Sequence, residues 1–336
     1  MRIATFAAPL SRDGPGLLLR DLGREDAQID AALAIMAEVK PDIIVLTNVD
    51  HDFDGLALAA LQRRVAAMIP GIDHAFALTP NTGLPTGYDL DRNGRLGEAR
   101  DAQGYGRFRG DGGMAILSRW PINSAAVTDL SALVWADQPF ATLPEGYFTA
   151  EEKKDLRLST TGHWIVPVAA PGGAIDLLAF SATPPVFDGP EDRNGLRNRD
   201  ELRLWTAVLD GAFGAIANDF VVIGNSNLDP VDGDGFPDAM RAFLADPRLQ
   251  DPLPASDGAA QAADTAHQGD PAFDTADWDD TGPGNLRVSY VLPSASLRIA
   301  DAGVFWPAPD DPKAALLGDD GLAAGPHRLV WVDVSR

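Results

Sequence analysis

The chain has 336 residues, of which 45% are hydrophobic, and a formal net charge of −22. This charge opposes nonspecific binding to nucleic acid, which depends on clustered Lys and Arg, and it attracts cations. The chain has no cysteine, which excludes disulfides, thiolate metal sites and cysteine nucleophiles. No run approaches the ~18 apolar residues of a membrane span, so we expect no membrane partner.

The organisation of the chain indicates a single domain. A length of 336 residues is long for an ordinary domain but fits a large α/β sandwich. No repeat and no shift of composition marks a linker, so we predict a single domain over residues 1–336, and a monomer. The first residues, MRIATFAAPL, lack the apolar stretch of a secretory leader. We therefore expect a cytoplasmic protein, or a secreted or periplasmic one if a leader has been removed.

Strands and helices alternate in the first third of the chain. Residues 2–8 and 41–47 are predicted as strands, and residues 26–38 and 55–68 as helices. In the first of these helices, apolar side chains recur at helical spacing and Asp26 lies near the start, where a negative charge suits the helix dipole.

The rest of the chain continues the alternation. A helix is predicted over residues 197–217, with Leu202, Trp205 and Leu209 on one face. Further strands are predicted at residues 112–122, 174–182, 219–224, 285–294 and 327–334. Long loops rich in Gly, Pro and Asp are predicted at residues 79–111, 182–196, 229–238 and 245–284. Loops of this kind carry the sites of large α/β folds.

The segment VVIGNSNLDPVDGDG, residues 221–235, holds an unusual strand end. The apolar run stops at Gly224, and Asn225, Ser226 and Asn227 follow. A strand that ends in a Gly-Asp-x-Asn turn presents a carboxylate to a metal ion and a phosphate. Here an amide stands where the carboxylate would be.

Seven motifs occur in one fixed order: RIATF, PDIIVL, GGMAILSRWPI, ATPPVFDGPEDRNGLRN, IGNSNLDP, NLRVSYVLPS and HRLVWV. This order resembles the endonuclease/exonuclease/phosphatase superfamily, and most closely a bacterial branch with the TPPVFDGPEDRNG loop. The resemblance runs nearly from end to end. It implies an α/β fold, a four-layer sandwich of two packed mixed β-sheets flanked by helices.

The resemblance also implies a chemistry. Members of this superfamily cleave phosphate esters with Mg²⁺ or a similar ion at one edge of the sheets. An Asn on the first strand and a Glu on the second bind the metal, and a His after a middle strand stabilises the phosphate. The turn supplies an Asp for water and an Asn for phosphate, and a late Asp-His pair completes the site. A hard cation on oxygen ligands activates the water and neutralises phosphoryl charge.

Few of these groups are present at the matching positions. The resemblance places the two strand ligands at Ala7 and Asn48, and the middle histidine at Ser181. The remaining substituted positions, each an aspartate in the family pattern, are Asn225, Ser289 and Pro326. Only Asn227 and His327 remain as catalytic remnants.

These substitutions predict a catalytically degenerate member of the superfamily, a pseudoenzyme that acts by binding or interaction. Losing one member of a catalytic unit costs orders of magnitude in rate, and here most members are replaced. The expected partner is a protein or a small anionic ligand. The alternative is a divalent-metal-dependent phosphodiesterase or phosphatase that uses Mg²⁺ or Mn²⁺ on relocated ligands such as Asp50, Asp52 or Asp188.

Residues 89–101, DLDRNGRLGEARD, begin with the pattern D-x-D-x-N-G. Oxygen donors at alternate positions before a Gly turn are how calcium loops surround their ion. The predicted ligands are the side chains of Asp89, Asp91 and Asn93, the carbonyl of Arg95, and Asp101 or Glu98. No bidentate Glu is twelfth in the loop, so a helix-loop-helix hand is not predicted, and a solvated turn is the alternative to structural Ca²⁺.

The loop over residues 183–201 is dense in polar side chains, and the resemblance places it beside the former catalytic positions. Its arginines could hold an anionic ligand through bidentate hydrogen bonds. Alternatively, Asp192 and Asp200 would pair with Arg193 and Arg197, brace the loop and begin a helix. The bracing interpretation is the favoured one.

Overall fold

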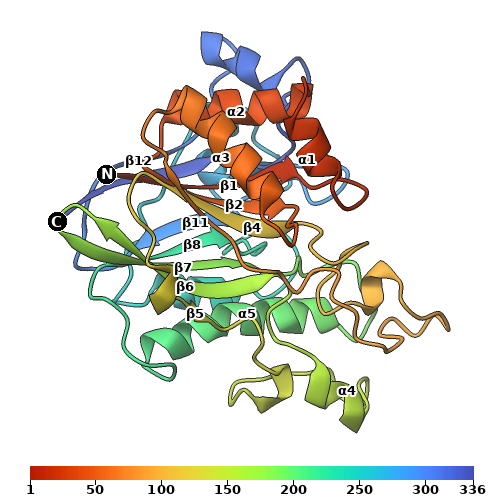
Figure 1. The fold of residues 1–336 in the computed structure, drawn as a ribbon. Coiled ribbons are helices and arrows are strands. Elements are labelled where there is room, and N and C mark those ends of the chain that lie inside the picture. The colour runs from red at the N-terminus through yellow and green to blue at the C-terminus, as the bar shows by residue number, and fades with distance from the viewer.

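Thirteen strands and seven α-helices make up this computed structural model, which describes residues 1–336 (Figure 1). The strands are β1 (Arg2–Leu10), β2 (Ile43–Val49), β3 (His74–Phe76), β4 (Gly113–Ser118), β5 (Thr128–Asp129), β6 (Gly162–Ala170), β7 (Gly173–Ser181), β8 (Phe220–Asn225), β9 (Ala276–Asp277), β10 (Asn285–Leu286), β11 (Ser289–Pro293), β12 (Arg298–Val304) and β13 (Val330–Ser335). The α-helices are α1 (Leu17–Leu22), α2 (Ala27–Val39), α3 (Leu56–Met68), α4 (Ala150–Asp155), α5 (Arg193–Leu209), α6 (Pro237–Leu244) and α7 (Asp257–Gln261). Five short 3₁₀ helices are η1 (Ala99–Asp101), η2 (Ser124–Ala126), η3 (Trp135–Asp137), η4 (Pro271–Phe273) and η5 (Pro312–Leu317).

Two mixed β-sheets form the centre of the fold. The first has six strands in the order β12-β13-β1-β2-β4-β3, and the second has five in the order β11-β8-β7-β6-β5. In the first sheet β1 is parallel to β2, and in the second β7 is parallel to β8, whereas their other neighbours are antiparallel. Strands β9 and β10 form a separate two-stranded ribbon.

The two sheets pack face to face through alternating side chains. In β7 and β8, Leu177, Ala179, Val221 and Ile223 belong to the same buried cluster as the residues of β1 and β2. The intervening Leu178 belongs to a second cluster on the outer face of the five-stranded sheet. Since successive side chains of a strand point to opposite faces, strands β6, β7, β8 and β11 each contribute to both clusters.

Helices cover the outer face of each sheet, which gives the four layers predicted from the sequence. In Figure 1, α1, α2 and α3 lie beside the β1, β2 and β4 side, and α5 runs along the opposite side below β5 and β6. Leu202 and Trp205 of α5 pack into the second cluster, and Leu33 and Leu61 of α2 and α3 belong to the first. The mixed α/β sandwich is thus confirmed. No helix is both long enough and apolar enough to cross a membrane.

Aspartates fix where two of these helices begin. The Asp26 carboxylate accepts a hydrogen bond of 3.0 Å from the Ile29 amide, which caps α2. The Asp52 carboxylate accepts hydrogen bonds from the amides of Leu56 and Ala57, at 2.8 and 2.7 Å, in the first turn of α3. Both predicted helices are therefore present within one residue of their expected bounds.

Several predicted elements have different bounds. The strand predicted over residues 285–294 is divided into β10 and β11, because the Arg287 amide donates to the Asp229 carboxylate instead of a neighbouring strand. The helix predicted over residues 197–217 begins at Arg193 and ends at Leu209, ahead of Gly211, whose φ of 85° suits a helix end. The strand predicted over residues 112–122 ends at Ser118, before Pro121.

Strand β6 is the largest element that the sequence did not predict. It forms an antiparallel hairpin with β7 over nine residue pairs. The turn uses Gly172 and Gly173, whose φ values of 88° and 141° are favourable only for glycine. The apolar run WIVPVAA and the following Pro-Gly-Gly carried the signal, although Pro167 within the run argues against a central strand. Helix α1 and the edge strand β12 were also missed.

We predict that Ile223→Ala lowers the free energy of unfolding by about 3 kcal/mol, because it leaves a cavity between the two sheets where the side chain is fully buried. Urea denaturation followed by circular dichroism measures the change. Leu96→Ala is the control, since Leu96 is 70% exposed and its loss should change stability by about 0.5 kcal/mol or less. Equal effects of the two substitutions would contradict the packing described here.

Candidate functional site

A cavity of about 530 Å³ lies where the parallel strand pairs of the two sheets end. Its lining includes six residues singled out from the sequence, namely Ala7, Asn48, Ser181, Asn225, Asn227 and His327. Ala7 pairs with the residue before Asn48 across β1 and β2, and Ser181 pairs with Asn225 across β7 and β8. Positions that lie up to 320 residues apart in the chain therefore meet at one site, as the motif order indicated.

The other two singled-out positions lie beside the cavity and do not line it. Ser289 pairs with Asn225 in the sheet, and its hydroxyl is buried without a hydrogen-bond partner in the protein. The Pro326 carbonyl accepts a hydrogen bond from the Asp277 amide and anchors the β9 segment. Neither residue provides a carboxylate to the site.

The cavity lining contains no acidic side chain. Its polar groups are amides, hydroxyls, His327 and three arginines, which are Arg100, Arg193 and Arg197. Mg²⁺ and Mn²⁺ are hard cations that bind through carboxylate oxygens, usually with retained waters. These residues do not fit the divalent ion that the resemblance implies, because they offer no anion and three fixed positive charges.

The acidic residues considered as relocated ligands are engaged elsewhere. The Asp50 carboxylate accepts from the amides of Arg12 and Gly112 at 2.8 and 3.1 Å. Asp52 caps α3, and the Asp188 carboxylate accepts from the Asn194 amide at 2.5 Å. None of the three lines the cavity. Each holds the backbone around the site.

The two asparagines of the turn after β8 are bonded to each other. The Asn225 side-chain amide donates to the Asn227 side-chain oxygen at 3.1 Å, and the Asn225 side-chain oxygen accepts from the Asn227 backbone at 3.2 Å. The Asn227 amide group in turn donates to the Ala182 carbonyl at 2.8 Å. An aspartate at 225 could accept but not donate, so the amide completes a neutral network that fixes this turn.

His327 lies at the cavity wall without a carboxylate partner. Its ring packs edge-on against Trp278, with 5.1 Å between ring centroids, and its Nδ1 atom has no hydrogen-bond partner in the protein. Burial, with a smaller effect of the neighbouring Arg328 charge, lowers the pKa of His327 to about 4. The imidazole is therefore neutral near pH 7 and would not serve as a cationic contact for phosphate.

A second histidine, His163, lies close to the site but faces away from it. It is fully buried on β6 and stacks between Phe180 and Trp205 under α5. One ring nitrogen contacts the Ser159 hydroxyl at 2.8 Å and the other the Glu201 carbonyl at 3.1 Å. Burial lowers its pKa to about 3. His163 is a neutral core residue that does not line the cavity.

Glu201 supports the cavity wall from behind, a role that the sequence did not reveal. Its fully buried carboxylate accepts from the Thr160 amide and hydroxyl at 2.6 and 2.7 Å, and from the Thr183 amide at 2.8 Å. Both threonines line the cavity. Burial raises the pKa of Glu201 to about 7, while the positive charge of Arg197 opposes that shift.

The ion pairs predicted to brace the loop over residues 183–201 are wrong. The Arg197 guanidinium donates to two carbonyl oxygens, those of Leu158 at 2.9 Å and of Arg157. The Asp200 carboxylate instead accepts from the Trp135 indole at 2.8 Å and from Thr142. The nearest guanidinium to Asp200 is that of Arg203, at 3.2 Å, so the ion pair with Arg197 does not form.

Two exposed aromatic residues stand at the cavity mouth. Tyr105 and Phe187 are 62% and 72% exposed, and both belong to the lining. Phe187 has a φ of 70°, in the left-handed region that is unfavourable for a bulky side chain. The surrounding loop therefore holds a strained backbone conformation at the cavity mouth.

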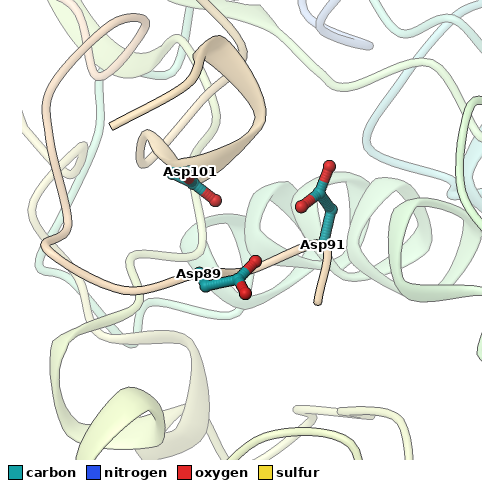
Figure 2. A group of neighbouring side chains, drawn as sticks. All are labelled: Asp89, Asp91 and Asp101. Carbon is teal, nitrogen blue, oxygen red and sulfur yellow. The ribbon is translucent and has the colours of Figure 1, made fainter. Parts of the chain in front are cut away.

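Three carboxylates of the predicted calcium loop lie close together outside the cavity. Single oxygens of Asp89, Asp91 and Asp101 are all within 4.8 Å of one another. Figure 2 shows the three carboxyl groups turned toward a shared space, with Asp101 at η1 and the other two on the preceding loop. These residues could hold a hard cation such as Ca²⁺.

The same oxygens accept hydrogen bonds within the loop. Asp89 accepts from the amides of Asn93 and Gly94, at 3.1 and 2.8 Å, and Asp101 accepts from Leu90 at 2.9 Å. The Asn93 amide group donates to Asp91 and Glu98, and its oxygen accepts from the Arg95 amide. The loop thus also satisfies the description of a solvated turn, so structural calcium stays a prediction.

Two packed mixed sheets flanked by helices, with a cavity at the ends of the parallel strand pairs, place this protein in the class of α/β sandwich folds. The chain matches the family model described as "Endonuclease/Exonuclease/phosphatase family" over residues 16–331. The protein belongs to this family. No curated protein matches its sequence.

Solved structures of the family have the same fold. An endonuclease/exonuclease/phosphatase from Beutenbergia cavernae is 18% identical with a TM-score of 0.58, over 99% of this chain and 71% of that one. A family protein from Leptotrichia buccalis is 13% identical with a TM-score of 0.55, over 100% of both chains. A Neisseria 3′ phosphatase bound to a product DNA hairpin is 16% identical with a TM-score of 0.51, over 100% of both chains. At these identities the likeness concerns the fold.

We predict that Glu201 makes the protein less stable as the pH rises. Its folded-state pKa of about 7 lies above the ordinary value of 4.5, so its contribution is full below pH 4.5 and is lost as the pH rises through 7. Glu201→Gln removes this titration, and its unfolding free energy should fall less than that of the original protein between pH 4.5 and 7. Urea denaturation at several pH values measures the difference. The exposed Glu145→Gln is the control, and parallel curves for all three proteins would contradict the assignment.

For the acidic loop we predict that Ca²⁺ raises the melting temperature and that Asp91→Asn removes the rise. A ligand at about 100 times its dissociation constant adds about 2.7 kcal/mol of stability. Asp91 is the appropriate target because its oxygens bond only to Asn93. Mg²⁺ at the same concentration is the control for ionic strength. Equal melting temperatures with and without Ca²⁺ would leave the loop as a solvated turn.

Proposed function

We propose that this protein is a non-hydrolytic member of the endonuclease/exonuclease/phosphatase family, which binds a ligand in its central cavity and does not cleave it. The observation that carries the proposal is the lining: in a chain of net charge −22, the cavity contains three arginines and no carboxylate. Divalent-metal hydrolysis of a phosphate ester needs the opposite arrangement, a cluster of anionic oxygens around the ion.

The state of the remaining polar groups supports the same proposal. A general base must reach the proton it abstracts and must have a suitable pKa. Asn225 and Asn227 are amides without basic function and are bonded to each other. His327 is neutral, lacks a carboxylate to orient it and has an unpartnered Nδ1. None of these groups is arranged to activate water.

The proposal favours a small ligand over nucleic acid. The Neisseria relative was solved with a DNA hairpin, but DNA binding depends on neutralising many phosphates. This chain has 27 basic and 49 acidic residues, and its three cavity arginines line a single cavity of about 530 Å³. That volume is typical of small-molecule pockets.

The experiment is hydrolysis of p-nitrophenyl phosphate and bis-p-nitrophenyl phosphate with Mg²⁺, Mn²⁺ or Ca²⁺. We expect no turnover above that of an Asn225→Ala variant purified in the same way, since a contaminating phosphatase would act equally in both samples. Circular dichroism establishes that both samples are folded. Metal-dependent turnover that the variant lacks would overturn the proposal and favour the relocated-ligand enzyme.

A further inference from the structure

Resting on the proposed function, we propose that the cavity binds an amphipathic oxyanion: a carboxylate or phosphate group held by Arg193 and Arg197 of α5, with an apolar body against Leu90, Trp135 and Phe148. This places the anion on the helix side of the cavity. The catalytic positions of the family pattern, Asn225 among them, lie instead at the strand ends.

Arg197 carries a charge that no acidic side chain pairs with directly. Its two hydrogen bonds go to the carbonyls of Leu158 and Arg157, which are neutral acceptors. Burial lowers the pKa of Arg197 to about 10, with Glu201 opposing and Arg193 adding to that shift. The guanidinium stays protonated near pH 7. A half-buried cation without a direct counter-ion is unfavourable, and a bound oxyanion would supply the missing charge.

Arg193 has unused capacity at the same place. Its Nη1 atom donates to the Leu90 carbonyl at 2.6 Å, whereas its Nε atom is buried without a hydrogen-bond partner in the protein. The nearest acidic oxygen, on Glu191, is 3.9 Å from Nε and too far for a hydrogen bond. A planar guanidinium with a free donor is suited to a carboxylate or phosphate.

Two features of α5 disfavour the positive charges of this pair, and the Glu191 carboxylate, 3.9 Å from Arg193 Nε, offsets them only on one side. Residues 193 and 197 are one helical turn apart, and like charges at this spacing repel. Arg193 is also the first residue of the helix, where the dipole disfavours a positive charge. An oxyanion between the two side chains would reverse both effects.

An apolar wall adjoins the two arginines. Leu90, Trp135, Phe148 and Leu156 line the cavity, and they belong to the second buried cluster. The Arg197 guanidinium lies 5.8 Å from the centroid of the Trp135 ring, and Arg193 bonds to the backbone of Leu90. The charged and apolar surfaces therefore adjoin each other, so a ligand that combines an oxyanion with an apolar body would contact both.

Isothermal titration calorimetry with four probes tests the proposal. Phenyl phosphate and benzoate combine an oxyanion with an aromatic ring. Inorganic phosphate provides only the oxyanion, and benzyl alcohol provides only the aromatic ring. We expect at least one of the two aryl oxyanions to bind about tenfold or more tightly than either partial probe. The tighter of the two identifies the head group as phosphate or carboxylate.

Charge-removing variants locate the head group. Arg193→Gln and Arg197→Gln should each weaken the aryl oxyanion about tenfold, since each removes a charge-assisted hydrogen bond, and should leave benzyl alcohol unchanged. Arg193→Gln keeps the test valid if Arg197→Gln does not fold, because Arg197 also supports residues 157 and 158. Arg63→Gln, at an exposed position of α3, is the matched control and should bind normally.

The outcomes separate this inference from the proposed function. Absence of aryl-oxyanion binding by the folded protein, or equal binding by the arginine variants, would overturn the inference and leave the absence of hydrolysis standing. Release of inorganic phosphate from phenyl phosphate in the presence of Mg²⁺, lost in Asn225→Ala, would instead overturn the proposed function.

Discussion

The packing of the two sheets is the constraint on which the site depends. Alternating residues such as Leu177 and Ile223 hold the five-stranded sheet against the six-stranded one. Each sheet contains one parallel pair, and these pairs end at the same edge of the sandwich. Ala7, Asn48, Ser181 and Asn225 therefore meet at one cavity. In open α/β sheets, the carboxyl ends of parallel strands are also where ligands bind.

This packing does not require the charges of a metal site. The core is complete without them, and the side chains of Asn225 and Asn227 satisfy each other at the strand end. Burying an unpaired carboxylate is costly, so neutral amides at this edge cost the fold little. The same architecture can therefore surround a cavity whose charged side chains are the arginines Arg100, Arg193 and Arg197.

The sequence was informative where order and periodicity carry the information. The motif order placed Asn227 and His327 in one site, and apolar runs located β1, β2, β7 and β8. Sequence reasoning failed for contacts between residues that lie far apart in the chain. The partners of Arg197 are carbonyl oxygens 39 and 40 residues away, and every backbone offers such groups, so side-chain identity favoured nearby aspartates instead. The support of Thr160 and Thr183 by Glu201 was missed for the same reason.

The central claim is that the cavity binds an oxyanion without cleaving it, and ³¹P NMR of phenyl phosphate mixed with the protein and Mg²⁺ tests both halves in one sample. The account predicts a shifted or broadened phenyl phosphate resonance that persists, with no inorganic phosphate signal. Growth of an inorganic phosphate signal that requires Mg²⁺ and the intact Asn225 turn would contradict it.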